Sequence, residues 1–472
     1  MNRSALSGTF KPYVIFLIFG IAVGTIVGMG FGLPLSACFL AAIYFIFSLF
    51  RPRYALYLFI LSYPLFSTFS LSLGNKIPDI NFNRAMVSII VISFFLCAYF
   101  KKIKFNKINN IDVLMIIFSL FTIISMAFNY NSYQLIQNSL TFMDCFVIPF
   151  LIYFFIKNII NNNKDFIKFT IILIIPAIYL SIMGIYEHFS LNDLFPVEVS
   201  SDVFDYEYNQ GLRVSESGIS RVNGSLEFPE SFGLILAMIM LIISYHFGPI
   251  YNSQKGKLLK NWKLILILSL LGFALYCNMY RSVWLGTIAG FIIRFGLFQR
   301  QRFKLLFSII FIAIVVWAYA EKMKSTSVYT ERITNVKTLH ARIATYKSAL
   351  AILTYNPGLG VGFNNFSDIY TKFNYSRTFR GAESRPWVHN SFLKICVESG
   401  IIGFILFVLI LKSFFLYMLR LLRDKEGILL SAICLSVFVF YIINVSFTTM
   451  GHDPSVNILF YALMGTLIGR VN

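Results

Sequence analysis

Residues 399–419, SGIIGFILFVLILKSFFLYML, form an apolar run that contains one charged residue, Lys412. The run has the length that an α-helix needs to cross the hydrocarbon core of a bilayer, roughly 17–25 residues. The whole chain has this character, since its 472 residues are 57% hydrophobic and 13% charged. Such continuous runs exclude an ordinary soluble globule and the short alternating strands of an outer-membrane barrel. The sequence therefore predicts an all-α, polytopic helical membrane protein.

The apolar runs predict about 12–14 transmembrane helices. Lys and Arg cluster in alternate connections, such as 101–107 and 300–304, which indicates cytoplasmic loops and cytoplasmic termini. The net charge of +19 follows this topology pattern, so we predict no nucleic-acid partner. Residues 12–50 form either two spans or a re-entrant hairpin. The fourteen candidate spans are 12–30, 33–50, 54–72, 84–100, 111–128, 139–156, 169–186, 231–247, 262–279, 282–297, 304–320, 399–419, 427–446 and 455–469.

Two long outer loops divide the chain into five segments. They are the N-terminal helices (1–186), an acidic loop (187–230), the central helices (231–320), a basic loop (321–398) and the C-terminal helices (399–472). The basic loop holds eleven Lys and Arg residues against five acids, on the side where topology statistics predict few cations. Its charge therefore calls for a functional reason.

The basic loop contains two recognisable elements. Residues 330–352 have apolar positions at helical spacing and predict an amphipathic helix that lies at the membrane interface. The stretch YNPGLGVGFNNF at 355–366 ends this helix with a proline and three alternate glycines. It has no Lys-Ser/Thr after it, so we interpret it as a flexible re-entry turn rather than a phosphate-binding loop.

His389 lies immediately before the 399–419 run, in the sequence WVHNS with Asn390 beside it. A partly dehydrated imidazole at this position favours its neutral form and can accept a proton near neutral pH. The alternative is a hydrogen-bonded histidine at the membrane interface with no chemical role. The other histidines are scattered, without the close pairs that indicate a metal site, and we predict no metal ligand.

Arg281, in NMYRSVWLG, lies at a predicted outer junction between two apolar runs, next to Tyr280. A guanidinium group there is suited to bind phosphate bidentately, although an arginine that only marks the membrane boundary has the same position. Arg221 is a second predicted outer cation directly before a helix. We expect these groups to form an outward-facing site for a lipid phosphate or diphosphate. Three further arginines lie on the approach to His389: Arg377, Arg380 and Arg385.

The acidic residues at two places in the sequence each have two alternative roles. Asp144 lies well inside an apolar run, where a carboxylate is either functional or paired with a neighbouring polar helix face. Asp202, Asp205 and Glu207 either bind a divalent cation or belong to a solvated loop.

Four segments together resemble the superfamily of O-antigen ligases and polymerases, which are bacterial lipid-linked glycan transferases. They are RVNGSLEFPESFG (221–233), YRSVWLGTIAG (280–290), NPGLGVGFNNF (356–366) and HNSFLKICVESGIIG (389–403). The last resembles the family pattern of His, then Asn, Ser or Gln, nine residues and Gly-x-x-Gly. Where the family often has a GHPN-like segment, this chain has LEFPES instead.

The resemblance implies an inverting, metal-independent glycosyltransferase with no cofactor, in the cytoplasmic (inner) membrane with its active site on the outer face. The donor would be an undecaprenyl-diphosphate-linked glycan. The acceptor would be lipid A-core for a ligase, or a second lipid-linked unit for an O-antigen or exopolysaccharide polymerase. A flippase for lipid-linked oligosaccharides is the alternative from another class. The predicted catalytic residues are His389, Arg281 and Arg221, and the predicted substrate-binding residues are Asn390, Arg385, Arg380, Arg377 and Tyr280.

Overall fold

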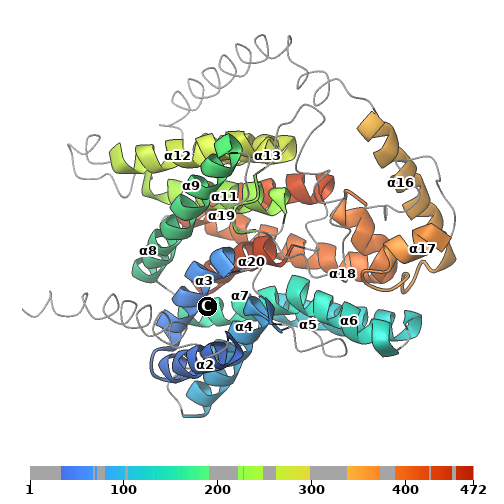
Figure 1. Cartoon of the computed structure of the whole chain (residues 1–472), viewed down its shortest axis with the longest axis horizontal. Helices are drawn as coiled ribbons and strands as arrows, with labels where there is room; N and C mark the ends of the chain where they lie inside the picture. The colour runs from blue at the N-terminus through green and yellow to red at the C-terminus, as the bar shows by residue number, and fades with distance from the viewer. Residues whose placement is uncertain are drawn as a thin grey trace, which may run out of the picture. The chain divides into compact units, whose positions relative to one another are not determined.

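A computed structural model describes most of the chain as helix (Figure 1). The described residues divide into two compact units, Met1–Phe59 with Phe69–Lys104, and Ile60–Thr68 with Phe105–Asn472. The predicted all-α membrane fold is confirmed. The described residues are 33–66, 70–71, 80–100, 105–130, 132–160, 162–190, 222–226, 228–247, 262–297, 337–372, 388–424, 427–448 and 453–470.

The first unit contains helices α2 (Leu33–Phe50) and α4 (Phe82–Tyr99), and the first part of α3 (Pro52–Phe66). The Tyr44 hydroxyl donates to the carbonyl of Ala55 at 2.9 Å. The predicted span 54–72 was wrong at its end, because α3 stops at Phe66 and a two-residue strand, β1 (Ser70–Leu71), pairs antiparallel with β2 (Ile80–Asn81). Pro64, which has no N–H to donate, lies in the last turn of α3.

The second unit contains the remaining helices and the candidate site. They are α5 (Asn110–Asn129), α6 (Ser132–Phe142), the π-helix η2 (Met143–Val147), α7 (Ile148–Ile159), α8 (Asn163–Ile172), α9 (Ile174–Ser190), α11 (Pro229–Ile243), the 3-10 helix η3 (Ser244–Phe247), α12 (Trp262–Asn278), α13 (Arg281–Gly296), α16 (Lys337–Tyr355), α17 (Phe366–Lys372), α18 (Ser391–Leu421), α19 (Ile428–Phe447) and α20 (Pro454–Ile468).

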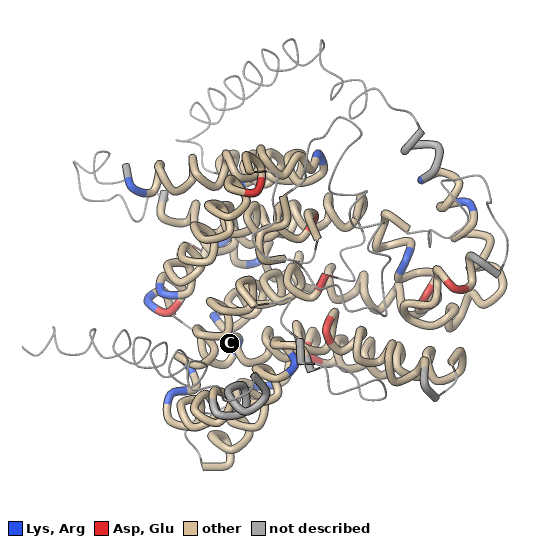
Figure 2. Tube along the Cα trace, viewed as in Figure 1, with Lys and Arg blue, Asp and Glu red and all other residues tan. Residues whose placement is uncertain are grey.

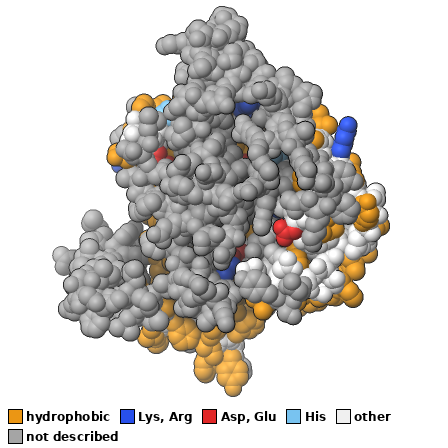
Figure 3. Space-filling view, turned by 45° about the vertical axis from the view of Figure 1, so that its right-hand side comes forward, with side chains coloured by type: hydrophobic (Ala, Val, Ile, Leu, Met, Phe, Trp, Pro, Cys, Tyr) orange, Lys and Arg blue, Asp and Glu red, His pale blue; other side chains and the backbone are white. Residues whose placement is uncertain are grey.

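Seven helical stretches among the described residues are long and apolar enough to cross a membrane, and three shorter apolar helices accompany them. Most of the length of these helices carries no charged residue (Figure 2). The space-filling view shows hydrophobic side chains along the margins of the described surface (Figure 3). The predicted spans 12–30 and 304–320 lie outside the described residues.

Glycines allow close helix contacts at two places in the second unit. On α13, a Cβ at Gly286 would lie 2.4 Å from the side-chain nitrogen of Asn444, and one at Gly290 would lie 3.1 Å from the carbonyl of Ser436. The two helices therefore run antiparallel, with the beginning of α13 beside the end of α19. On α20, a Cβ at Gly465 would lie 2.6 Å from the carbonyl of Tyr153 on α7. Small residues at such positions let membrane helices pack closely.

Helix α18 is interrupted, which the sequence prediction of a single span from residue 399 missed. The helix begins earlier, at Ser391, and has non-helical backbone at Gly400, with φ of 68° and ψ of 177°. Residues 391–399 thus form a short helix of their own, which we call the half-helix. Because a glycine separates it from the rest of α18, other parts of the structure have to determine its direction.

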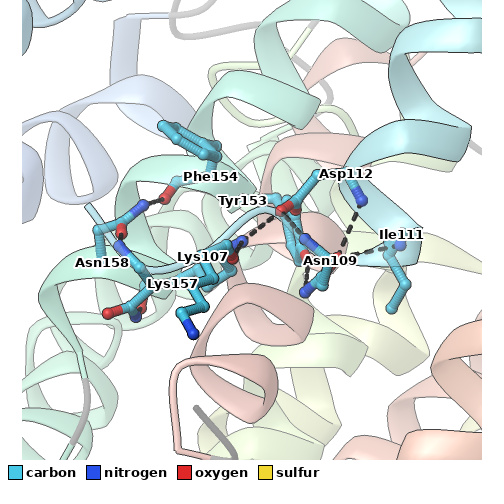
Figure 4. A network of polar contacts seen from close by, with 9 residues as sticks. Lys107, Asn109, Ile111, Asp112, Tyr153, Phe154, Lys157 and Asn158 are labelled. Carbon is cyan, nitrogen blue, oxygen red and sulfur yellow. Dashed lines mark hydrogen bonds and ion pairs between the residues drawn. The ribbon is translucent and has the colours of Figure 1, made fainter.

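A buried ion pair joins α5 to α7 at the beginning of α5. The Lys157 ammonium contacts the carboxylate of Asp112, and both side chains are almost fully buried (Figure 4). Asp112 also accepts a hydrogen bond from the backbone of Asn109, whose side chain caps α5 in return. Asn106 donates from its side chain to the carbonyl of Lys157 at 3.1 Å. These contacts satisfy two charges that would otherwise be costly to bury.

Candidate active site

His389 is held by its backbone between α16 and the half-helix. The hydroxyl of Tyr346 on α16 donates to the carbonyl of His389 at 3.0 Å. Asn390 caps the half-helix, since its side-chain oxygen accepts from the N–H of Leu393 at 3.0 Å. The hydroxyl of Ser391 donates to the carbonyl of Thr448 at the end of α19, at 2.9 Å. The His389 side chain itself is half-buried.

Residues 356–366, which we call the glycine loop, pack backbone to backbone against the break in α18. Val361 and Gly362 donate to the carbonyls of Val397 and Glu398 at 3.0 and 2.9 Å, and Ile401 donates to the carbonyl of Pro357 at 2.8 Å. A Cβ at Gly400 would lie 2.1 Å from the carbonyl oxygen of Gly358. The predicted flexible turn was therefore wrong, because the loop completes the backbone hydrogen bonds that the break leaves open.

The glycine loop is also attached to the end of α5. The hydroxyl of Ser125 donates to the carbonyl of Leu359 at 2.6 Å, and the hydroxyl of Tyr130 donates to the carbonyl of Phe363 at 2.7 Å. Because Val361 and Gly362 already donate to α18, their N–H groups do not form a phosphate cradle. The glycines serve a close approach of two backbones, which no larger residue would permit.

Helix α16 corresponds to the predicted amphipathic helix, but its apolar residues do not share one face. Ala349 and Ile352 are fully buried in a cluster with Val361 and Val397. Ile343 and Leu350, by contrast, are exposed. One side of α16 therefore covers the glycine loop, and another side remains apolar and uncovered by the described residues. Residues 330–336 of the predicted helix lie outside the described residues.

Arg281 is the first residue of α13 and its side chain is exposed. Just before it, Met279 has a positive φ of 54°, which is unusual for a residue other than glycine. Tyr280 donates through its hydroxyl to the carboxylate of Glu230, in the first turn of α11. The tight turn between α12 and α13 thus places a cation and a phenol at the start of α11.

The segment 222–226, directly after Arg221, is buried at the same end of the helices. The Glu187 carboxylate accepts from the backbone N–H groups of Asn223 and Gly224 at 3.1 and 2.9 Å. The side chain of Asn278, at the end of α12, donates to the carbonyl of Val222 at 3.2 Å. Gly224 has a positive φ of 61°, a conformation that favours glycine at this position of the segment.

Asp453 caps α20 beside these residues, and the sequence analysis did not single it out. Its carboxylate accepts from the N–H of Val456 at 3.1 Å and from the hydroxyl of Ser231. The pKa of this carboxyl is raised from 3.8 to about 6, because burial and, to a smaller extent, the charge of Glu230 outweigh the lowering effect of these hydrogen bonds. The aspartate stands directly before a proline at a helix start, a sequence signal by which this cap could have been predicted.

The residues around His389 and those around Arg281 lie at one end of the second unit. The end of α19 contacts the half-helix through Thr448, and α13 runs antiparallel along α19 with its first residue at that end. Asp453 and Glu230 mark the starts of α20 and α11 at the same place. The structure thus brings together helix ends that are far apart in the sequence.

The remaining predicted site residues have different outcomes. Arg221, Arg377, Arg380 and Arg385, and the acids Asp202, Asp205 and Glu207, lie outside the described residues. Asp144 is buried on the π-helix η2, next to Cys145, whose carbonyl accepts from the side chain of Asn457 at 2.8 Å. The sequence analysis also missed Lys394 and Glu398, two charged residues buried in the half-helix.

The pKa of Asp453 makes a prediction for stability. A carboxyl that binds its proton more tightly in the folded protein has a higher pKa there than in the unfolded protein. The free energy of unfolding therefore decreases as pH rises from the unfolded-state pKa to the folded-state pKa. From 3.8 to about 6, this amounts to about 3 kcal/mol. Asp453→Asn retains the cap and is expected to remove this loss, measured as the difference in thermal unfolding between variant and wild type from pH 4 to 7. Parallel pH dependences of the two proteins would contradict the assignment.

Comparison with known proteins gives one result for the chain. Residues 265–408 match a family model described as O-antigen ligase. No curated protein matches the chain. The matched residues run from α12 to the middle of α18 and include Arg281, the glycine loop, His389 and Gly400. Members of this family are lipid-linked glycan transferase-like enzymes. Together with the apolar helices of this chain, the match implies a multi-pass membrane protein. Residues 265–408 are thus similar to the O-antigen ligase family, which supports placing the chain in the O-antigen ligase superfamily.

Proposed function

We propose that this protein transfers a glycan from an undecaprenyl-diphosphate-linked donor to an acceptor hydroxyl at the outer face of the cytoplasmic membrane. The observation that carries the proposal is the packing of α13 on α19, which puts the start of α13 with Arg281 at the end of α19. Thr448 at that end accepts from Ser391, two residues after His389. A candidate proton acceptor and a candidate phosphate-binding cation thereby belong to neighbouring helix ends.

The chemistry needs both groups. The acceptor hydroxyl oxygen attacks the anomeric carbon of the donor sugar while the bond to the diphosphate oxygen breaks, which inverts the anomeric configuration. His389 takes the hydroxyl proton as general base. The electron pair of the broken bond leaves with the polyprenyl diphosphate, and the Arg281 guanidinium stabilises the negative charge that develops there. We include Arg221 in this anion site, and assign Arg377, Arg380, Arg385 and Tyr280 to the binding of substrate.

The part of Asn390 in substrate binding is confined to its amide nitrogen, because its side-chain oxygen caps the half-helix. Likewise, Tyr280 would contact substrate through its ring, since its hydroxyl donates to Glu230. Both residues therefore support the site as much by positioning His389 and Arg281 as by contact with the glycan.

The acceptor distinguishes the two forms of this reaction. A ligase would use lipid A-core, and a polymerase would use a second lipid-linked repeat unit. We favour the ligase because the His-Asn pattern with Gly400 and Gly403 resembles that of ligases.

A flippase for lipid-linked oligosaccharides has one observation in its favour, the break in α18. Broken helices in transporters expose backbone groups to a central site. Here the backbone groups around Gly400 are engaged by the glycine loop. The break is thereby closed by protein backbone, which favours a fixed site for glycosyl transfer.

The test is a transfer assay with the purified full-length protein in proteoliposomes. A defined undecaprenyl diphosphate glycan is offered with lipid A-core in one reaction and with a second lipid-linked unit in another. Formation of the lipid A-core conjugate supports the ligase, and a lengthened lipid-linked glycan supports the polymerase. If the protein moves the donor between leaflets and forms neither product, the flippase replaces the proposal.

Replacement of Arg281 by alanine is expected to weaken use of the donor. Loss of a charge-assisted hydrogen bond to phosphate costs about 1–3 kcal/mol, or roughly a fivefold to 150-fold decrease in kcat/KM for the donor. Arg420→Ala, which removes an exposed arginine at the other end of α18, serves as the matched control. Equal donor kinetics in both variants would make Arg281 a marker of the membrane boundary only.

A further inference from the structure

Two charged side chains are buried in the half-helix, and the proposed reaction does not use them. The Lys394 ammonium lies 3.8 Å from the carboxylate of Glu398, four residues later in the same helix. Their side chains are only 7% and 1% exposed. A lysine and a glutamate are rarely buried so deeply, and burying the pair does not by itself stabilise a fold relative to apolar residues. A functional reason for the pair is therefore worth seeking.

The glycine loop binds Glu398 through its backbone and passes beside its carboxylate. Its carbonyl accepts from the N–H of Gly362 at 2.9 Å. The backbone N–H groups of Asn364 and Phe366 lie next to its carboxylate. Asn364 itself has a positive φ of 67°. Lys394, on the other side of the pair, lies close to the Cys145 thiol of η2.

These contacts act on the element that carries His389. The half-helix begins two residues after His389 and ends at Gly400, where the helical backbone is interrupted. At its beginning it is tied to Thr448 by Ser391. At its end, the carbonyl of Glu398 accepts from Gly362 and the Glu398 carboxylate lies beside the glycine loop. A change in the direction of the half-helix about Gly400 would move His389 with it.

We propose that Glu398, paired with Lys394, is a positioning residue that sets the direction of the half-helix against the glycine loop and thereby places the His389 imidazole. The inference rests on the proposed function, in which His389 accepts the proton of the acceptor. A carboxylate suits this task because its charge attracts the ammonium on one side and faces the loop amides on the other. Apolar side chains would fill the same space without fixing a single orientation.

The test compares Glu398→Gln with a matched variant at the other buried ion pair, Asp112→Asn. Both changes replace a buried carboxylate that faces a lysine, but Asp112 lies at the end of α5 opposite the glycine loop. Transfer kinetics are measured with the full-length protein, together with amide hydrogen exchange of the segments 356–366 and 391–401. Lys394→Arg, which retains the positive charge, is the conservative variant.

We expect Glu398→Gln to lower kcat by about a hundredfold, the scale on which a small displacement of a catalytic group acts. KM for the donor should change by less than about threefold, since the anion site is not altered. Exchange of the Val361 and Gly362 amides should become faster. Asp112→Asn should lower the melting temperature but leave kcat within about threefold of wild type, as expected for a change remote from the reacting groups. Lys394→Arg should retain most of the activity.

Three results would overturn the inference while leaving the proposed function intact. The first is that Glu398→Gln has the kcat and the amide exchange of the wild type. The second is that Asp112→Asn loses as much kcat as Glu398→Gln, which would indicate general destabilisation. The third is a loss of kcat in Glu398→Gln without faster exchange, which would indicate a direct chemical role. If the wild-type protein transfers no glycan, the proposed function fails, and unchanged exchange in Glu398→Gln would then reject the positioning contact separately.

Discussion

His389→Ala is expected to lower the rate of glycan transfer by about a hundredfold to ten-thousandfold, the contribution of a general base. The fold should survive the change, because Tyr346 binds the carbonyl of His389 and the half-helix is capped by Asn390. The side chain is half-buried, so its removal leaves no large cavity in a packed core. Transfer is measured in proteoliposomes at equal protein amounts, after the melting temperature of the variant has been compared with that of wild type.

His188→Ala is the matched control for this experiment, since His188 is a half-buried histidine in the last turn of α9. It should transfer glycan at the wild-type rate. The pH profile adds a second readout, because loss of a base with an imidazole pKa removes the rise in rate between acid and neutral pH. A well-folded His389→Ala protein with near-normal transfer would remove this residue from the mechanism and leave Asp453 as the titratable group to examine.

Gly400→Ala is expected to cost at least about 3 kcal/mol in stability and to abolish transfer, from a strained backbone and an unrelieved contact together. The residue has φ of 68° and ψ of 177°, a region that residues with a Cβ avoid. An added Cβ would also meet the carbonyl oxygen of Gly358 at 2.1 Å, and a backbone atom cannot move aside as a flexible side chain can. The glycine loop and the half-helix would therefore have to separate.

Gly358→Ala provides the control in the same loop, because a Cβ there would meet nothing within 4 Å. Its melting temperature and transfer rate should stay close to those of wild type. The measurement for both variants is thermal unfolding in detergent, followed by transfer for any protein that remains folded. If Gly400→Ala melts and transfers like Gly358→Ala, the backbone contact between the loop and α18 is not what the glycine provides.

Several features of the candidate site were predictable because their signals are local in sequence. An imidazole next to a polar Asn-Ser pair and a long apolar run indicated a histidine at a membrane boundary. Arg281 stood out because it lies between two apolar runs, on the outer side of the membrane, where few cations are predicted. These inferences need only the spacing of charges and apolar residues along one segment.

The remaining features depend on contacts between distant segments. The hydroxyl of Ser125 binds the carbonyl of Leu359, 234 residues away, and this contact helps to turn an apparently flexible glycine stretch into a fixed loop. The burial of Asp453 beside Ser231 and Glu230 likewise requires α20 and α11 to meet at their first turns. A sequence pattern carries no information about which turns of two helices face each other.

The sequence by itself determined the helical membrane class and most of the spans, since bilayer thickness and the cost of charge in hydrocarbon act on each segment separately. It also singled out the two residues on which the proposed chemistry depends. Only the tertiary structure decided that α18 breaks at Gly400, that the glycine loop closes the break and that α13 and α19 bring Arg281 and the half-helix to the same end. The physical reason is that each of these features is stabilised by hydrogen bonds and close packing between backbones, which exist only once the distant segments have met.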